Sequence, residues 1–174
     1  MFRVVITGGP ATGKTSLINA LSNLGYSTFN EAARKIIQQQ LTLKTNKVPW
    51  DNILGFSKLV LAEQIKDFKS ANSDLVFYDR GIPDIIGYIN HGQQKIFDHL
   101  KSSNKINRYD HVFILPPWED IYKTDNERRE SFKEAKLIYN EIEKAYIRSG
   151  YHPVKVPVES VNNRIKFILN KLSE

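Results

Sequence analysis

The sequence predicts an α/β fold, a three-layer sandwich with helices on both faces of a five-stranded parallel sheet. Strand-like and helix-like segments alternate along the chain, which is typical of parallel sheets. The apolar run at 75–78 is continuous, as expected for a strand buried on both faces. A glycine-rich segment at 8–15 joins the first strand to the first helix, in the order found at phosphate-binding loops.

The first half of the chain carries start and stop signals for its elements. Gly25 ends the first helix, because glycine takes the left-handed conformation common after a helix. Asp51 stands before apolar residues at helical spacing and is the expected N-cap. The predicted elements are a strand at Phe2–Thr7, a helix from Lys14 to about Asn23, a strand at Ser27–Asn30, a helix from Glu31 to about Leu41, a polar loop at 42–50 and a helix at 52–70.

The second half continues the alternation. Pro83 opens a helix, because proline fits the first helical turn. Prolines at both ends of the last strand place it at or near the edge of the sheet. The predicted elements are a strand at Leu75–Tyr78, a helix within 83–102, a strand at Asp110–Leu115, a long helix at Asn126–Arg148, a strand at Pro153–Pro157 and an amphipathic helix at Val161–Leu172.

Residues 8–15 read G-x-x-x-x-G-K-T, the pattern of a phosphate-binding loop, or P-loop. Its glycines let backbone N–H groups turn toward phosphate oxygens, and the following helix adds its N-terminal dipole. We expect Lys14 to reach the β- and γ-phosphates of ATP and the Thr15 hydroxyl to bind Mg²⁺. Ser16 either bonds the α-phosphate or is an ordinary first-turn serine. The predicted nucleotide-binding residues are Gly8, Gly9, Pro10, Ala11, Thr12, Gly13, Lys14, Thr15 and Ser16.

An acidic residue followed by an arginine closes the buried strand at 75–78. Asp79 is the expected second Mg²⁺ ligand, the alternative being an N-cap carboxylate before the next helix. AAA-class ATP hydrolases usually carry a glutamate at the next position, where it activates water, but this chain has Arg80. The charge of Arg80 can stabilise a phosphoryl group during its transfer. Alternatively, Arg80 forms a salt bridge within the protein.

Glu31 follows the second strand and faces the same end of the sheet as Asp79. This arrangement resembles small-molecule kinases of the nucleoside and nucleotide kinase group, in which a carboxylate orients or deprotonates the acceptor hydroxyl. Glu31 and Asp79 are both candidates for that base. Arg34 lies one turn beyond Glu31 and either binds substrate with it or forms an ion pair with it.

The polar segment after the fourth strand predicts a lid at about 117–130. Arg128 and Arg129 are candidate catalytic residues, as internal arginine fingers that stabilise the transferred phosphoryl group. They can alternatively belong to a charged first helical turn, where the helix dipole disfavours arginine. Trp50 and Trp118 either stack on a base or pack in the protein.

Composition narrows the functional classes. The 174 residues suffice for one domain, 1–174, and no cysteine is available for disulfides or thiolate metal sites. The net charge of +6 is scattered, so we expect neither a nucleic-acid groove nor a membrane partner, and a cytoplasmic location is the default.

Two short strings approximate GTPase motifs. The string at 84–87 matches the GTPase pattern D-x-x-G but lies inside a predicted helix, and the string at 104–107 lacks the aspartate of the guanine motif N-K-x-D. ATP is therefore favoured over GTP.

Six segments spread over the chain form a recognisable set. They are G-G-P-A-T-G-K-T-S at 8–16, E-A-A-R-K-I-I at 31–37, F-Y-D-R-G-I-P-D at 77–84, P-P-W-E-D-I-Y at 116–122, D-N-E-R-R-E at 125–130 and Y-H-P-V-K-V-P at 151–157. With them the sequence resembles the NadR-like P-loop NTPase family, an AAA-type ATPase domain related to ribosylnicotinamide kinase. The resemblance implies a P-loop fold of the kinase-like type, with strand order 2-3-1-4-5, and use of ATP.

Two functions fit these residues. The first is an ATP–Mg²⁺ phosphotransferase acting on a small hydroxyl-bearing, nucleoside-like acceptor. The second is a slow ATPase or GTPase, or a nucleotide-controlled binding module. The first is favoured, because no glutamate follows Asp79 to activate water. The sequence indicates neither the acceptor nor the oligomeric state.

Overall fold

The computed structural model describes residues 1–122 and 130–174. Within them, five strands form one sheet, and every strand pairing is parallel. The strands are β1 (Phe2–Gly8), β2 (Ser27–Phe29), β3 (Leu75–Asp79), β4 (His111–Leu115) and β5 (Val154–Lys155). Their order, β2-β3-β1-β4-β5, confirms the predicted topology. The short β5 pairs only with β4, as expected for an edge strand with flanking prolines.

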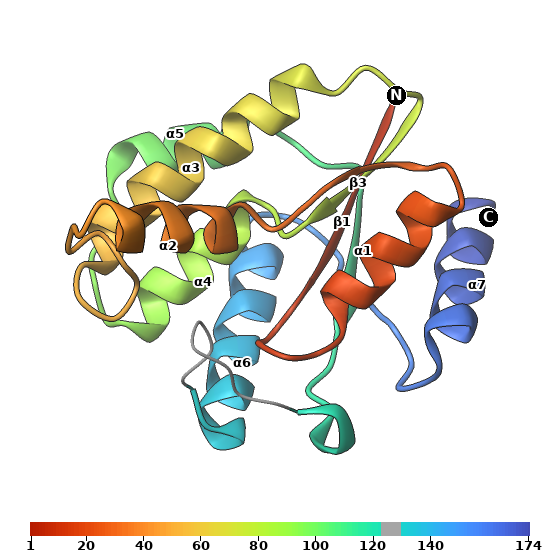
Figure 1. Ribbon diagram of the computed structural model, residues 1–174. Helices are drawn as coiled ribbons and strands as arrows, with labels where there is room; N and C mark the ends of the chain where they lie inside the picture. The colour runs from red at the N-terminus through yellow and green to blue at the C-terminus, as the bar shows by residue number, and fades with distance from the viewer. Residues whose placement is uncertain (123–129) are drawn as a thin grey trace.

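Helices cover both faces of the sheet (Figure 1). The described α-helices are α1 (Lys14–Asn23), α2 (Ala32–Thr42), α3 (Ile53–Ser70), α4 (Ile82–His91), α5 (Asp98–Ile106), α6 (Phe132–Arg148) and α7 (Val161–Leu172). Helices α1 and α7 lie together on one face, and α4 and α6 pack against each other on the opposite side. None of the described helices combines the length and the apolar character needed to cross a bilayer.

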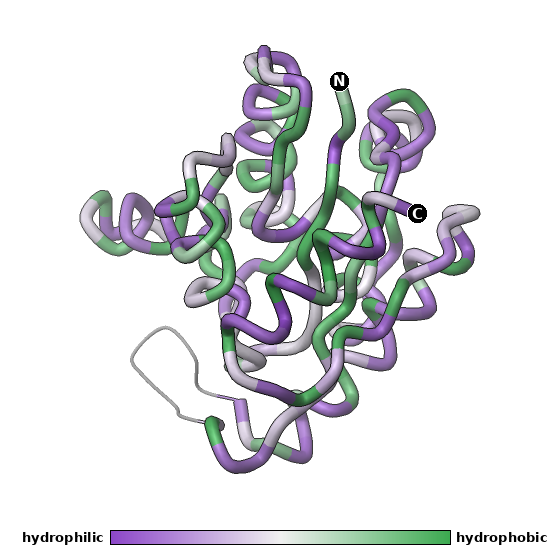
Figure 2. The backbone as a smooth tube through the Cα atoms, turned by 90° about the vertical axis from the view of Figure 1, so that its right-hand side faces the viewer, coloured by the Kyte–Doolittle hydropathy of each residue, from purple (hydrophilic) through white to green (hydrophobic). Residues whose placement is uncertain are grey.

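The core consists of three apolar clusters. One lies between the sheet and α1 with α7, and includes Leu17, Phe77 and Ile168. A second lies between the other face and α6, with Tyr146 fully buried. The third joins α2, α3, α4 and α5 to one another. Figure 2 shows the hydrophobic residues concentrated along the central strands, with hydrophilic residues alternating along the outer helices.

Parallel pairing brings the carboxyl ends of β1 and β3 to one edge of the sheet. Ile6 pairs with Asp79, and the Arg80 N–H donates to the Ile6 carbonyl at 3.0 Å. The glycine loop that follows β1 and the Asp79–Arg80 pair that follows β3 are therefore neighbours, as the rule for open parallel sheets requires.

The helix boundaries differ from the predicted ones in three places. The N-cap of α3 is Asn52, whose Oδ1 accepts the Gly55 N–H at 2.8 Å, so the predicted cap at Asp51 is one residue early. The region 83–102 contains two helices, α4 and α5, because the chain leaves the helix at Gly92 and starts again at Asp98. The apolar pattern did not show this break, because apolar residues occur on both sides of the polar turn and were assigned to one region.

The long helix α6 begins later than predicted. Ser131 is its N-cap, and its hydroxyl accepts the Glu134 N–H at 3.2 Å. Glu130 and Ser131 therefore precede the helix, whereas the prediction began at Asn126. Asn126 itself lies outside the described residues.

Candidate active site

The predicted phosphate loop connects β1 to the first turn of α1. Gly8 and Gly13 have φ values of 143° and 86°, which residues other than glycine rarely adopt. The Lys14 ammonium is buried and folds over the loop. It donates to the Gly9 carbonyl at 2.7 Å, to the Gly8 carbonyl at 3.2 Å and to the Thr12 hydroxyl at 3.4 Å.

The surroundings of Lys14 shift its pKa. Burial, and after it the nearby Arg80, lower the pKa of Lys14 from 10.5 to about 7, against the attraction of Glu31, Asp79 and Asp84. A phosphate bound here would add negative charge beside the ammonium and favour its charged form. The loop therefore combines backbone N–H donors at a helix start with a buried lysine, as phosphate binding requires.

Asp79 is a buried carboxylate with a free ligand atom. Its residue is 3% exposed, and its Oδ1 has no hydrogen-bond partner among the described residues. Burial raises the pKa of Asp79 from 3.8 to about 7, and repulsion from Glu31 adds to the shift. The alternative role as a helix cap is not observed, since α4 is capped at Gly81 with the help of Asp84.

The residues present fit a magnesium ion. No group of three or more His, Cys, Asp or Glu among the described residues could hold a metal by itself. Mg²⁺ at phosphate sites needs only one or two protein ligands, because water and phosphate oxygens complete its octahedron. The orphaned Asp79 oxygen and the exposed Thr15 hydroxyl at the start of α1 are donors of this kind.

Arg80 joins the phosphate loop to α2 and α4. Its Nε donates to Glu31 Oε1 at 2.7 Å, and its Nη1 donates to the Gly8 carbonyl at 3.0 Å and to Asp84 Oδ1 at 2.9 Å. Its Nη2 donates to the Tyr88 hydroxyl at 3.2 Å. Its backbone is left-handed, with φ at 75°, which is uncommon outside glycine and occurs at functional sites. The predicted salt bridge is thus present, and it holds Glu31 beside the loop.

Asp84 organises the site, and sequence reasoning missed it. Its Oδ1 accepts the Thr7 hydroxyl at 2.6 Å, and its Oδ2 accepts the Tyr146 hydroxyl at 2.6 Å and the Gly81 N–H at 2.9 Å. The missed signal was its place in the first turn of α4, where a carboxylate commonly accepts the N–H of the cap residue. Asp84 therefore ties β1, α4 and α6 to the arginine.

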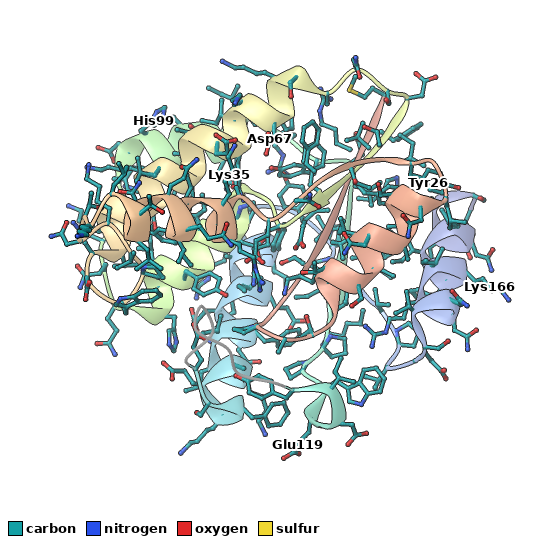
Figure 3. The ribbon with its side chains drawn as sticks, in the orientation of Figure 1. Tyr26, Lys35, Asp67, His99, Glu119 and Lys166 are labelled. Atoms are coloured by element: carbon teal, nitrogen blue, oxygen red, sulfur yellow. The ribbon has the colours of Figure 1, made fainter. Side chains whose placement is uncertain are left out.

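A cavity of about 480 Å³ lies beside the phosphate loop, and we call it the side cavity. Helices α2, α3, α4 and α6 supply most of its wall, and Figure 3 draws the side chains of these helices as sticks. Its lining residues are Pro10, Glu31, Ala33, Arg34, Ile37, Pro49, Trp50, Asp51, Ile53, Phe56, Ser57, Val60, Gln64, Arg80, Asp84, Ile85, Tyr88, His91, Gly92, Glu130, Glu134 and Ile138. This volume and the largely apolar wall suit a small organic molecule.

Two acceptor atoms in the wall of the side cavity lack donors. Gln64 Oε1 and Glu130 Oε2 are buried, and neither has a hydrogen-bond partner within the described residues. Buried acceptors of this kind normally find a donor, so these two atoms are available to a donor from outside the described residues, such as water or a bound molecule. Sequence reasoning assigned neither residue a binding role, because Gln64 lies inside α3 and Glu130 just before α6, where no local pattern marks them as functional.

The structure brings most, but not all, of the predicted site residues together. The loop, Asp79, Arg80 and Glu31 come together, and Glu31, Arg34 and Trp50 line the side cavity. Trp118 lies elsewhere: its Nε1 donates to Asp120 at 3.1 Å, and the Arg164 guanidinium lies 4.8 Å from its ring centroid. The predicted lid falls mainly on 123–129, so Arg128 and Arg129 lie outside the described residues and stay predictions.

Comparison with known proteins assigns the chain to a family. A family model described as an AAA domain matches residues 3–164. No curated protein sequence matches the chain significantly.

Solved structures with the same fold include kinases. Deoxyadenosine kinase from M. mycoides with bound dATP is 17% identical, with a TM-score of 0.72 over 100% of both chains. Thymidylate kinase from Ehrlichia chaffeensis is 15% identical, with a TM-score of 0.66 over 98% of each chain. Thymidylate kinase from Candida albicans is 16% identical, with a TM-score of 0.66 over 99% of this chain and 91% of its own. The predicted kinase-like P-loop fold is confirmed.

Proposed function

Because this chain belongs to the AAA domain family and has the fold of P-loop kinases, we propose that it transfers a phosphoryl group from ATP to a small nucleoside-like acceptor. One observation carries the proposal. The 2.7 Å contact between Arg80 Nε and Glu31 Oε1 holds a carboxylate of the side cavity next to the phosphate loop. A donor site and an acceptor site therefore meet at one ion pair.

The donor half of the site binds the triphosphate. The backbone N–H groups of residues 8–15 and the Lys14 ammonium surround its phosphate oxygens. Thr15 and Asp79 would hold Mg²⁺, which neutralises charge on the β- and γ-phosphates when bound. Arg80 already contacts the Gly8 carbonyl, so its positive charge lies at the loop and stabilises charge that develops on the transferred group.

Glu31 is the proposed base, in preference to Asp79. Glu31 lines the side cavity, whereas Asp79 does not. The acceptor hydroxyl oxygen attacks the γ-phosphorus, and its proton passes to the Glu31 carboxylate. The bond from the γ-phosphorus to the bridging oxygen breaks, and ADP leaves with that electron pair. Arg80 positions Glu31 for this step.

The acceptor half is the side cavity. Phe56, Ile85 and Tyr88 provide apolar and aromatic surface for a flat ring, and Gln64 Oε1 accepts a hydrogen bond from it. A phosphotransferase needs a cavity for its acceptor beside the phosphate loop, whereas a hydrolase, whose acceptor is water, does not. Arg80 also stands where a water-activating glutamate would be required, which favours transfer over hydrolysis.

The test is phosphate transfer from ATP and Mg²⁺ across a panel of nucleosides, nucleotides and other hydroxyl-bearing metabolites. We expect one class of acceptor to be phosphorylated, and Glu31→Gln to lower kcat about 100-fold or more, the usual contribution of a general base. Hydrolysis at one rate whatever the acceptor would contradict the proposal.

The matched control is Glu63→Gln. Glu63 also forms an ion pair, with Lys35 of α2 at 2.5 Å, but neither residue lines the side cavity. Figure 3 labels Lys35 on α2. The control loses a carboxylate–cation pair between α2 and α3 without changing a residue of the side cavity. A fall in kcat as large as that of Glu31→Gln would mean that the loss reflects altered helix packing.

A further inference from the structure

We propose that the acceptor of this chain is a nucleoside-type molecule without a phosphate group, and that the side cavity selects against nucleoside monophosphates. The inference rests on the proposed function and narrows its substrate class. It follows from the charges and the hydrogen-bonding groups that face the side cavity.

The first argument concerns the atom that is phosphorylated. A hydroxyl acceptor must lose a proton, so a carboxylate beside it is useful. A phosphate acceptor is already anionic at neutral pH and needs cations around it instead. The side chain of the cavity wall that is held next to the phosphate loop is Glu31, which is a carboxylate.

The second argument concerns Arg80, an arginine that could have held an acceptor phosphate. Each of its three nitrogens donates to a protein oxygen, including Glu31, Asp84 and Tyr88. The carboxylates of Glu31 and Asp84 balance its charge at 2.7 and 2.9 Å. Binding an acceptor phosphate through Arg80 would require breaking this buried network and leaving a carboxylate unpaired, which is strongly unfavourable.

The third argument concerns the remaining charges of the wall. Among the described lining residues, five carboxylates face two arginines, Arg34 and Arg80. Besides Glu31 and Asp84, the carboxylates belong to Asp51, Glu130 and Glu134. Glu134 lies 3.3 Å from His91 Nε2, which balances its charge only when the histidine is protonated. A phosphate dianion would enter a space whose described lining already carries excess negative charge.

The fourth argument concerns hydrogen-bond donors. The buried Gln64 Oε1 and Glu130 Oε2 lack partners in the described part of the chain, and both are acceptors. Hydroxyl and amino groups can satisfy them, and a nucleoside offers one more hydroxyl donor than its monophosphate, whose phosphate oxygens at neutral pH offer almost no donors. Charge and hydrogen bonding therefore favour the same acceptor class, one rich in hydroxyl and N–H groups.

The experiment measures transfer from ATP and Mg²⁺ to purine and pyrimidine nucleosides and to their 5′-monophosphates, in parallel. We expect kcat/KM for the best nucleoside to exceed that for its monophosphate by about 100-fold, and this ratio to fall with added salt. Equal or better use of monophosphates would overturn the inference and leave the proposed function standing. Transfer to neither class, with acceptor-independent hydrolysis, would overturn the proposed function and the inference with it.

Two variants test the origin of the selection. Glu130→Gln and Glu134→Gln should each lower the nucleoside-to-monophosphate ratio several-fold, mainly through KM for the monophosphate, because each removes one negative charge from the wall. Glu141→Gln is the matched control: it lies on α6, pairs with Lys144 at 2.7 Å and does not line the side cavity. An unchanged ratio in both wall variants would show that their charges do not select the acceptor.

Discussion

Replacing Asp79 by asparagine should stabilise the protein and abolish its phosphotransfer. The carboxylate is buried, and its Oδ1 has no partner among the described residues. Burial and the neighbouring Glu31 raise the pKa of Asp79 from 3.8 to about 7, so holding it ionised in the folded protein is unfavourable. The asparagine side chain has nearly the same shape and no charge to bury, but it cannot serve as an anionic ligand for Mg²⁺.

The magnitude follows from the pKa shift. A shift of roughly three pH units corresponds to about 4 kcal/mol of lost stability when the carboxylate is ionised. Burying the N–H donors of the asparagine amide without partners costs about 1–2 kcal/mol, which reduces that gain. The net stabilisation at about pH 8 is therefore about 2 kcal/mol, or about 4–8 °C in Tm for a chain of this size.

The pH dependence gives the effect its signature. From about pH 4 to about pH 7 the folded Asp79 keeps its proton while the unfolded carboxyl loses it, so wild-type stability falls as pH rises through that window. The difference between the variant and the wild type should thus be small at about pH 4 and reach its maximum above about pH 7.

Urea unfolding followed by circular dichroism across this range measures the difference in the absence of nucleotide. If Asp79→Asn is equally destabilising at both ends of the range, the carboxylate is a structural acceptor and the reasoning is refuted. Stabilisation accompanied by full phosphotransfer activity would refute the assignment of Asp79 to the metal.

Three further outcomes are expected. Gly87→Ala should destabilise the fold by about 2 kcal/mol or more, measured by urea unfolding, because its Cβ would lie 2.8 Å from the Ile142 Cα across the α4–α6 contact. Tyr146→Phe should cost about 1–2 kcal/mol in the same assay, since it removes the 2.6 Å hydrogen bond to Asp84 inside the core. Lys14→Ala should weaken ATP binding about tenfold or more by calorimetry while leaving the circular dichroism spectrum unchanged; undiminished affinity would contradict the phosphate-loop assignment.

The sequence predicted the features that depend on neighbouring residues. Residues 8–15 could be identified as a phosphate loop because backbone conformation and glycine spacing are local properties. The strand order followed from the resemblance to a family and is confirmed by the pairing of β1 with both β3 and β4. The ion-pair alternative for Arg80 was also foreseen, although its partner was not named.

Features built from distant segments could not be predicted. Asp84 acts through Thr7 and Tyr146, which are 77 and 62 residues away in the chain, and no local pattern marks such a contact. The side cavity is the space that the side chains of four helices leave between them. Its presence depends on how the helices pack and not on the periodicity of the sequence. Gln64 and Glu130 gain significance only from that cavity.

The ammonium of Lys14 already has acceptors, namely two carbonyl oxygens and one hydroxyl of its own loop. A nucleotide bound as proposed would compete with the protein for the same N–H protons, and its affinity would be the difference between two sets of hydrogen bonds. Changes that weaken the internal set should tighten nucleotide binding without adding any contact to the ligand. On binding, Lys14 would exchange acceptors of its own loop for phosphate oxygens, so substitutions within the loop can change the affinity for the nucleotide.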